Sequence, residues 1–195
     1  MKVEKIRLLA VIAILLFAMV GCTAVAPAPA ATTGDQPAAD TGTAAKKEYK
    51  DLVVGYAQIG AESEWRTANT ASIQETAKEL GINLKFSDAQ QKQENQIKAL
   101  RSFIAEKVDV IGIPPVVTTG WETVFQEAKD AGIPIILVDR RADVPEDLYV
   151  SYLGSDFTEE GRRAAKALAE IVSEKANIVE LVGTVGSAPA TDRGN

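Results

Sequence analysis

From residue 51 onward, short apolar runs alternate with amphipathic stretches, a pattern that predicts strands alternating with helices. The apolar runs are continuous, as is typical of strands covered on both faces. Predicted strands span 52–57, 82–86, 108–113, 135–138, 148–153 and 178–182. Predicted helices lie between them, at about 63–80, 88–104, 119–128 and 158–171. The first four strands start about 26–30 residues apart, the spacing of right-handed βαβ crossovers. The predicted fold class is therefore α/β, with a doubly wound parallel sheet.

Polar residues and glycine mark the expected ends of the helices. The first helix begins at about Ser63, and Gly81 ends it. Asp88 is the expected cap of the second helix. For the third, Thr119 and Glu122 have the spacing of a capping box.

The first 21 residues have the pattern of an export signal. Three basic residues, Lys2, Lys5 and Arg7, precede an apolar run at 8–20. This run has about 13 residues, fewer than the roughly 20 that a helix needs to cross a bilayer. We therefore expect a signal peptide over residues 1–21. The string Met19-Val20-Gly21-Cys22 resembles the lipobox of bacterial lipoproteins, which implies a lipid on Cys22; a free or buried Cys22 beside a conventional cleavage site is the alternative.

Residues 22–48 form a different kind of segment, rich in Ala, Pro and Thr and without a periodic apolar face. Such a composition cannot bury enough surface to offset the entropy of ordering, so we expect a disordered tether. Flexible chain of about this length reaches roughly 25–30 Å on average. The predicted division is thus a tether, then a lobe at 49–155, then the beginning of an incomplete second lobe at 156–195.

Composition narrows the possible chemistry. The 195 residues carry a net charge of −6 and include one Cys and no His. Without His, catalytic triads and His-ligated zinc are excluded, and a single Cys cannot form an internal disulfide. The acidic balance argues against nucleic acid as a partner. No GxGxxG or P-loop string is present, which counts against dinucleotides and nucleoside triphosphates, and we expect no cofactor or metal.

Ligands of doubly wound sheets bind at the carboxyl ends of the strands, so the loops at those ends are the candidate site. The loops at 58–66, 139–141 and 183–193 supply Trp, Asp and Arg. A Trp face packs against the C–H side of a sugar ring, a carboxylate accepts from hydroxyl groups, and a guanidinium donates to two oxygens at once. These loops therefore suit a polyhydroxylated ligand.

Five short strings occur in the order found in periplasmic sugar-binding proteins of ABC importers, of the ribose- and galactofuranose-binding type. They are Gly60-x-Glu62-Ser63-x-Trp65-Arg66, the run from Gln90 to Gln96, Thr119-Gly120-Trp121-Glu122, Val138-Asp139-Arg140 and Gly183-Thr184-Val185-Gly186. The resemblance covers residues 52–193. It implies a type I periplasmic-binding-protein fold, a monomer with one monosaccharide between two lobes. It also implies a lobe crossover near Asp156.

The resemblance further implies a set of ligand-binding residues: Glu62, Ser63, Trp65, Arg66, Asp139, Arg140 and Arg193. Thr191 stands where ribose-binding relatives have Arg, which argues against ribose, and Glu64 replaces a Gly of the enteric pattern. Ser187 and Thr191 are further candidates for the cleft.

Each of these residues has a simpler interpretation. Trp65 could cover the sheet, Arg66 could pair with a glutamate on the surface, and Asp139-Arg140 could be a turn at the start of a helix. Trp121 is expected in the core, and the run from Gln90 to Gln96 as the solvated start of a helix.

The predicted function is that of a substrate-binding lipoprotein, which captures a monosaccharide and delivers it to the membrane permease of an ABC importer. It would be exported and held at the membrane of the cell envelope by the lipid. A lipoprotein that hands its sugar to a membrane receptor is the alternative, and an enzyme with Asp139 or Glu62 as base has little support. The export signal excludes a LacI-type repressor domain. Because no helix follows the strand predicted at 178–182, we expect a fragment that binds sugar poorly alone.

Overall fold

A parallel sheet of five strands organises residues 53–153 of the computed structural model, which describes residues 46–172 and 175–195. The strand order is β2-β1-β3-β4-β5, and every neighbouring pair is parallel. The strands are β1 (Val53–Gln58), β2 (Asn83–Asp88), β3 (Val110–Ile113), β4 (Ile135–Val138) and β5 (Ser151–Leu153). The predicted α/β sheet is therefore confirmed. The expected signal peptide, Cys22 and nearly all of the tether lie outside the described residues.

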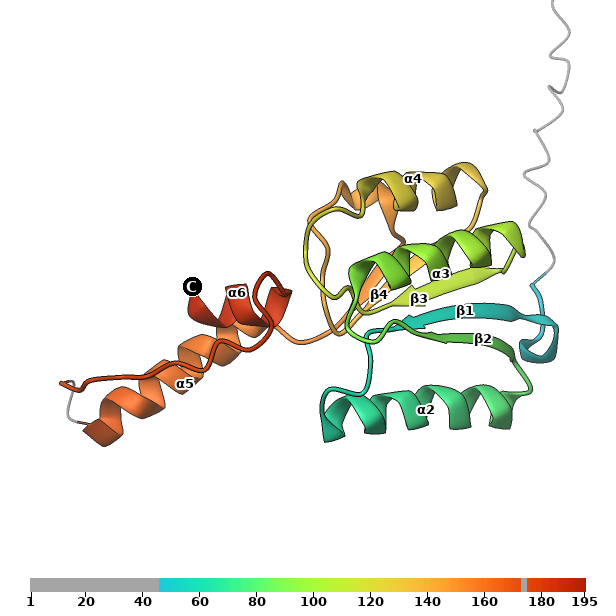
Figure 1. The fold of residues 1–195 in the computed structure, drawn as a ribbon. Coiled ribbons are helices and arrows are strands. Elements are labelled where there is room, and N and C mark those ends of the chain that lie inside the picture. Colours follow the sequence, from blue (N-terminus) through green and yellow to red (C-terminus); the bar gives the residue numbers. More distant parts are fainter. Residues whose placement is uncertain (1–45, 173–174) are drawn as a thin grey trace, which may run out of the picture. The chain divides into compact units, whose positions relative to one another are not determined.

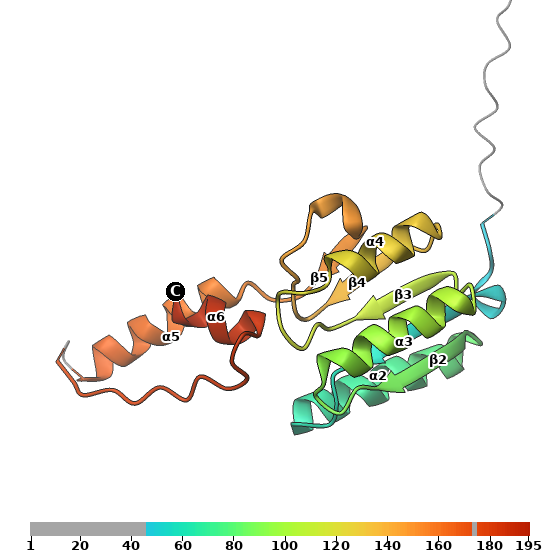
Figure 2. The same cartoon turned by 45° about the horizontal axis from the view of Figure 1, so that its top comes forward.

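Helices cover both faces of this sheet (Figures 1 and 2). Helix α2 (Glu64–Leu80) lies on one face, while α3 (Gln93–Ala105) and α4 (Glu122–Asp130) lie together on the other. The chain runs outward from β1 to β2 in one direction and from β3 to β5 in the other. The switch point between β1 and β3 is where sheets of this order open to a ligand.

The core lies between the sheet and the α3–α4 layer. It is closed by fully buried apolar side chains that include Leu100, Ile111, Trp121, Phe125 and Leu137. The indole N–H of Trp121 donates to the carbonyl of Val117 at 2.7 Å, so its polar atom is satisfied. The expectation that Trp121 is a core residue is confirmed.

The predicted boundaries of α2 are confirmed. Ser63 precedes the helix in an extended conformation, and its Oγ accepts from the backbone N–H of Arg66 at 3.1 Å. Gly81 ends the helix with φ = 72°, a left-handed conformation that glycine adopts without steric cost.

Both other predicted caps are wrong. Asp88 accepts from the N–H of Gln90 in a turn instead of capping α3, which begins five residues later. Gln90 and Gln91 have φ of 53° and 62°, and two left-handed residues in a row cannot belong to a right-handed helix. At α4 the residue before the helix is Trp121, and no side chain caps the helix. Thr119 precedes Gly120, whose φ of 85° also interrupts a helix.

Residues 157–195 contain α5 (Phe157–Val172) and α6 (Ala188–Gly194). The strand predicted at 178–182 is wrong: this segment has no regular secondary structure and its apolar side chains are exposed. No strand among the described residues pairs with it. Of the strand predicted at 148–153, only the end forms a strand, β5, and its first residue closes the short helix η2 (Glu146–Leu148). Another short helix, η1 (Tyr49–Asp51), precedes β1. None of the helices in the described ranges is long and apolar enough to cross a bilayer.

Candidate functional site

The loop after β1 delivers a buried arginine to the carboxyl edge of the sheet. Arg66 lies in the first turn of α2, and only 2% of it is exposed. Its Nε donates to Oε1 of Glu62 at 3.1 Å. Ser63 caps the same helix turn and so fixes where the arginine side chain begins.

The loop after β4 brings an aspartate to the same place. Asp139 immediately follows the strand and has φ = 64°, a left-handed conformation that aspartate tolerates better than most side chains. Its N–H donates to the carbonyl of Leu153 at 2.7 Å, which holds this conformation. Its Oδ2 accepts from Nη2 of Arg66 at 2.7 Å, which joins two loops 73 residues apart in sequence.

A second arginine lies beside this pair. Arg140 is 8% exposed, and its Nη1 donates to the carbonyl of Val116, in the loop after β3, at 3.2 Å. Its Nη2 is 3.8 Å from Glu62 Oε1, and its Nε is 3.9 Å from Asp139 Oδ2. Burial, and secondly the charge of Arg66, lower the pKa of Arg140, while the two carboxylates oppose this shift. The loops after β1, β3 and β4 therefore meet in one network.

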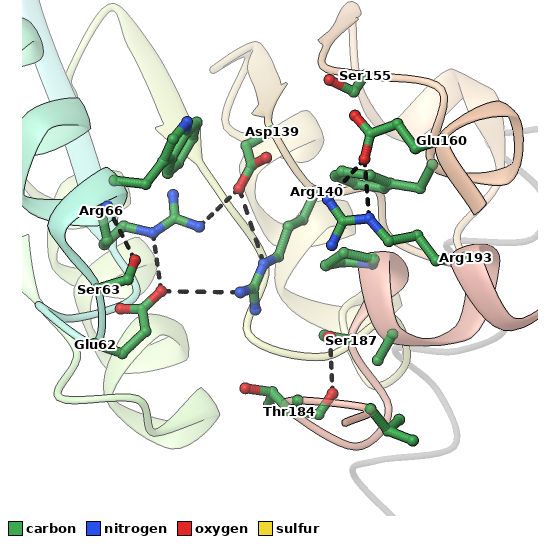
Figure 3. A pocket seen from close by; sticks show the side chains of 16 residues that line it. Glu62, Ser63, Arg66, Asp139, Arg140, Ser155, Glu160, Thr184, Ser187 and Arg193 are labelled. Carbon is green, nitrogen blue, oxygen red and sulfur yellow. Dashed lines mark hydrogen bonds and ion pairs between the residues drawn. The ribbon is translucent and has the colours of Figure 1, made fainter. Parts of the chain in front are cut away.

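This network forms one wall of a pocket of about 390 Å³ (Figure 3). Trp65 belongs to the same wall; it is 56% exposed, and its ring lies 4.7 Å from the guanidinium carbon of Arg66. The other lining residues come from the segment after β5 and include Ser155, Phe157, Glu160, Thr184, Ser187 and Arg193.

Three buried polar atoms in the network have no hydrogen-bond partner among the described residues. They are Oε2 of Glu62, Nη1 of Arg66 and Nε of Arg140. A buried polar atom without a partner costs roughly 1–3 kcal/mol of folding free energy. A ligand that both donates and accepts hydrogen bonds would remove this cost. The network thus contains one unpaired carboxylate oxygen and two unpaired guanidinium nitrogens.

Arg193 reaches the pocket from α6. Its guanidinium donates to Oε2 of Glu160 at 2.9 and 2.7 Å and lies 4.7 Å from the centre of the Phe157 ring. Both contacts hold the Arg193 side chain at the pocket, where Figure 3 shows it beside Glu160.

All seven ligand-binding residues predicted from the sequence line this one pocket. The simpler interpretation of Trp65 is wrong, because its side chain is exposed instead of covering the sheet. Arg66 does pair with a glutamate, Glu62, but the pair is buried instead of lying at the surface. Asp139 begins an irregular loop, and the short helix η2 starts only at Glu146. Of the further candidates, Ser187 lines the pocket but Thr191 does not.

Sequence reasoning missed Phe157 and Glu160, which line the pocket from the first turn of α5. The available signal was their position just after the fifth predicted strand, since a carboxyl-end loop precedes them. The glutamine run is largely exposed around the start of α3, as expected, but Gln96 at its end is fully buried, which the sequence did not reveal.

Comparison with known proteins is consistent with this geometry. A family model described as a periplasmic binding protein domain matches residues 54–195. The galactofuranose-binding protein YtfQ of Escherichia coli is 51% identical over 73% of this chain and 45% of its own length. A Mycobacterium smegmatis protein solved in complex with β-D-fucofuranose is 53% identical, covering 73% of this chain and 48% of the other, with a TM-score of 0.70.

The binding protein of an arabinose ABC transporter from Shewanella sp. ANA-3, bound to α- and β-L-arabinofuranose, is 51% identical. This match also covers 73% of the chain and 48% of the other, with a TM-score of 0.70. The chain therefore spans less than half the length of these relatives.

Proposed function

Since the chain belongs to the periplasmic binding protein domain family, we propose that it captures a monosaccharide for an ABC importer, and that the pocket beside Arg66 and Arg140 is where the sugar binds. The observation that carries this proposal is the set of three unpaired buried atoms, on Glu62, Arg66 and Arg140. Hydroxyl groups can both donate to the carboxylate and accept from the guanidinium groups, so one polyol satisfies all three.

Charge balance supports a neutral ligand. Three carboxylates and three guanidinium groups face the pocket: Glu62, Asp139 and Glu160, with Arg66, Arg140 and Arg193. Arginines that bind phosphate or carboxylate ligands supply positive charge that the ligand then neutralises. Here the protein's own carboxylates already neutralise the arginines, which favours an uncharged sugar over an anion.

Each proposed contact has a distinct role. Glu62 and Asp139 accept from sugar hydroxyls, while Arg66 and Arg140 donate to sugar oxygens. Trp65 packs its exposed face against the C–H side of the ring. Arg193 donates from the second wall, and Ser63 lies at the pocket edge while holding the helix turn of Arg66.

The furanose form is the proposed ligand form. One of the relatives above is named for binding galactofuranose, and the two solved structures contain fucofuranose and arabinofuranose. A five-membered ring presents its hydroxyls at other angles than a six-membered ring, so a network fixed by mutual ion pairs discriminates between them.

The wider proposal follows the same relatives. The protein is exported to the periplasm, releases its sugar to a membrane permease without converting it, works as a monomer, and is anchored through a lipid on Cys22. The tether covers 22–48, the sugar-binding lobe 49–155, and the second lobe begins at 156.

The test is isothermal titration calorimetry on the full-length protein with L-arabinose, D-galactose and D-fucose. Methyl β-D-galactopyranoside, which is locked in the six-membered form, is the matched control ligand. We expect binding of at least one free sugar and none of the locked pyranoside. If wild-type protein binds none of the free sugars, or binds the locked pyranoside equally well, the proposed ligand is wrong.

The matched variants are Arg140→Met and Arg141→Met. Arg141 is the next residue in sequence but pairs with Asp192 and does not line the pocket. Arg140→Met loses a buried donor, which should cost about 1–3 kcal/mol of binding free energy, or roughly tenfold to hundredfold in affinity. Arg141→Met should leave the affinity unchanged. Equal affinities of the two variants would remove Arg140 from the site.

Lipid anchoring is tested separately by membrane fractionation of the protein expressed in a bacterium that processes lipoproteins. Wild-type protein should sediment with the membranes, whereas Cys22→Ala should be released or remain unprocessed. Soluble wild-type protein with a free thiol on Cys22 would contradict the anchor.

A further inference from the structure

The glutamine run at 90–96 contributes no residue to the lining of the pocket. Its first members are exposed, but Gln96, in the first turn of α3, is fully buried. A buried side-chain amide needs both of its polar atoms satisfied, so the position of Gln96 is determined by its partners.

Those partners are the backbones of two strand ends. The Nε2 of Gln96 donates to the carbonyl of Ala57 at 2.9 Å and to that of Pro114 at 2.7 Å. Its Oε1 accepts from the N–H of Val116 at 3.0 Å. One side chain thus links the end of β1 to the loop that follows β3.

The sequence of the loop after β3 explains why a side chain, and not the backbone, links it to β1. Strands β1 and β3 pair in parallel up to Tyr56 and Gly112, but Pro114 and Pro115 have no N–H with which to continue the ladder. The amide of Gln96 supplies the missing donor to Ala57. It thereby fixes the path of a loop that the sheet itself no longer holds.

The same loop holds Arg140. The carbonyl of Val116 accepts from Nη1 of Arg140 at 3.2 Å, while the N–H of Val116 donates to Gln96. The peptide groups of Val116 are therefore bonded to both side chains, its N–H to Gln96 and its carbonyl to Arg140. This is the one hydrogen bond that the Arg140 guanidinium makes among the described residues, and its two ion pairs are longer, so it decides where the guanidinium points.

We propose that Gln96 is a positioning residue for sugar binding, acting through the backbone of Val116 on Arg140. The expected effect on sugar affinity rests on the proposed function. The expected effect on the orientation of Arg140 does not depend on it. Gln96 itself touches no ligand. It keeps the guanidinium of Arg140 aimed at the pocket before the sugar arrives, which lowers the ordering that binding requires.

A double-mutant cycle on sugar affinity tests the proposal, with calorimetry on the full-length protein and L-arabinose and D-galactose as probes. Gln96→Met keeps the length of the side chain but removes its three hydrogen bonds. We expect about a tenfold loss of affinity in the wild-type background and almost none in the Arg140→Met background. A loss of the same factor in both backgrounds would overturn the proposal.

The control is Gln58→Met. Gln58 is also fully buried and makes three hydrogen bonds, but its amide bonds to Asn69, to Thr70 and to the N–H of Ile59. None of these bonds involves Val116, so any loss of affinity that Gln58→Met causes should be equal with and without the Arg140 side chain. Coupling of Gln58 to Arg140 as strong as that of Gln96 would show a general loosening and would contradict a specific relay.

A measurement without sugar keeps the inference separate from the proposed function. Nitrogen-15 NMR reports rotation of the Arg140 guanidinium about its Nε–Cζ bond, which the hydrogen bond to Val116 slows. Gln96→Met should speed this rotation several-fold and Gln58→Met should not. If Gln96→Met does not fold, Gln96→Asn takes its place, because it retains the amide on a side chain too short to reach the same partners. Rotation unchanged from wild type in the variant that is measured would show that Gln96 does not position Arg140.

Discussion

Residues 52–57 and 178–182 have similar apolar sequences, but only the first of them forms a strand. Residues 53–57 of the first run lie in β1, which pairs with β2 and β3, and Ala57 is fully buried. The second remains irregular, with Val179 88% exposed and Leu181 93% exposed. The difference teaches that an apolar run predicts the tendency to form a strand, whereas hydrogen-bonded neighbours decide whether the strand forms.

The same contrast separates the helices. Helix α4 buries Val124, Phe125 and Ala128 against the sheet. Helix α5 is more strongly amphipathic in sequence, yet Phe157 is the only side chain that it buries within the described residues. We therefore expect the stability of this chain to reside in residues 53–153.

Hydrogen exchange should show the largest difference. The N–H of Ile111 donates to the carbonyl of Pro134 at 3.0 Å inside the sheet, so it should exchange only on global unfolding. The backbone of 178–182 makes no such bond among the described residues. We expect protection of at least about a thousandfold at Ile111 and almost none at Val179. Comparable protection at both sites would break the comparison.

Truncation of a core side chain should give the next largest effect. Phe125→Ala removes a fully buried ring and should lower the free energy of unfolding by about 3–5 kcal/mol. Leu181→Ala removes a comparable apolar side chain that is exposed, and should change it by less than about 0.5 kcal/mol. Urea denaturation measures both, and equal losses would mean that 178–182 is packed in solution.

A smaller effect should appear at alkaline pH. Burial raises the pKa of Tyr56 to about 12; the charge of Asp139 adds to this shift and that of Arg66 opposes it. Between pH 10 and 12 the unfolded chain releases this proton while the folded protein keeps it, so the free energy of unfolding falls with rising pH, by about 2–3 kcal/mol in total. Tyr56→Phe should lose less stability than wild type over this range. Parallel curves from denaturation at pH 9–12 would contradict the shift.

Local sequence patterns predicted most of the lobe. The alternation of strands and helices, the Ser63 cap and the Gly81 stop depend on neighbouring residues, and the structure bears them out. The seven candidate residues could be grouped because the carboxyl ends of parallel strands meet at one edge. The family resemblance supplied their identities.

What the sequence did not reveal depends on distant partners. The burial of Gln96 follows from prolines 18 and 19 positions away, whose missing N–H groups no local pattern connects to it. The caps expected at Asp88 and Thr119 failed because left-handed residues, Gln90 and Gly120, separate them from their helices. Segment 178–182 has the apolar pattern of a strand, but no strand among the described residues pairs with it.

The most direct test of the central claim is a crystal structure of the full-length protein with bound sugar, grown with L-arabinose or D-galactose. The account predicts a five-membered ring beside Trp65, with hydroxyl groups within hydrogen-bond distance of Glu62 Oε2, Arg66 Nη1 and Arg140 Nε, the three unpaired buried atoms. A sugar bound elsewhere, or bound here with those three atoms still unpaired, would contradict it.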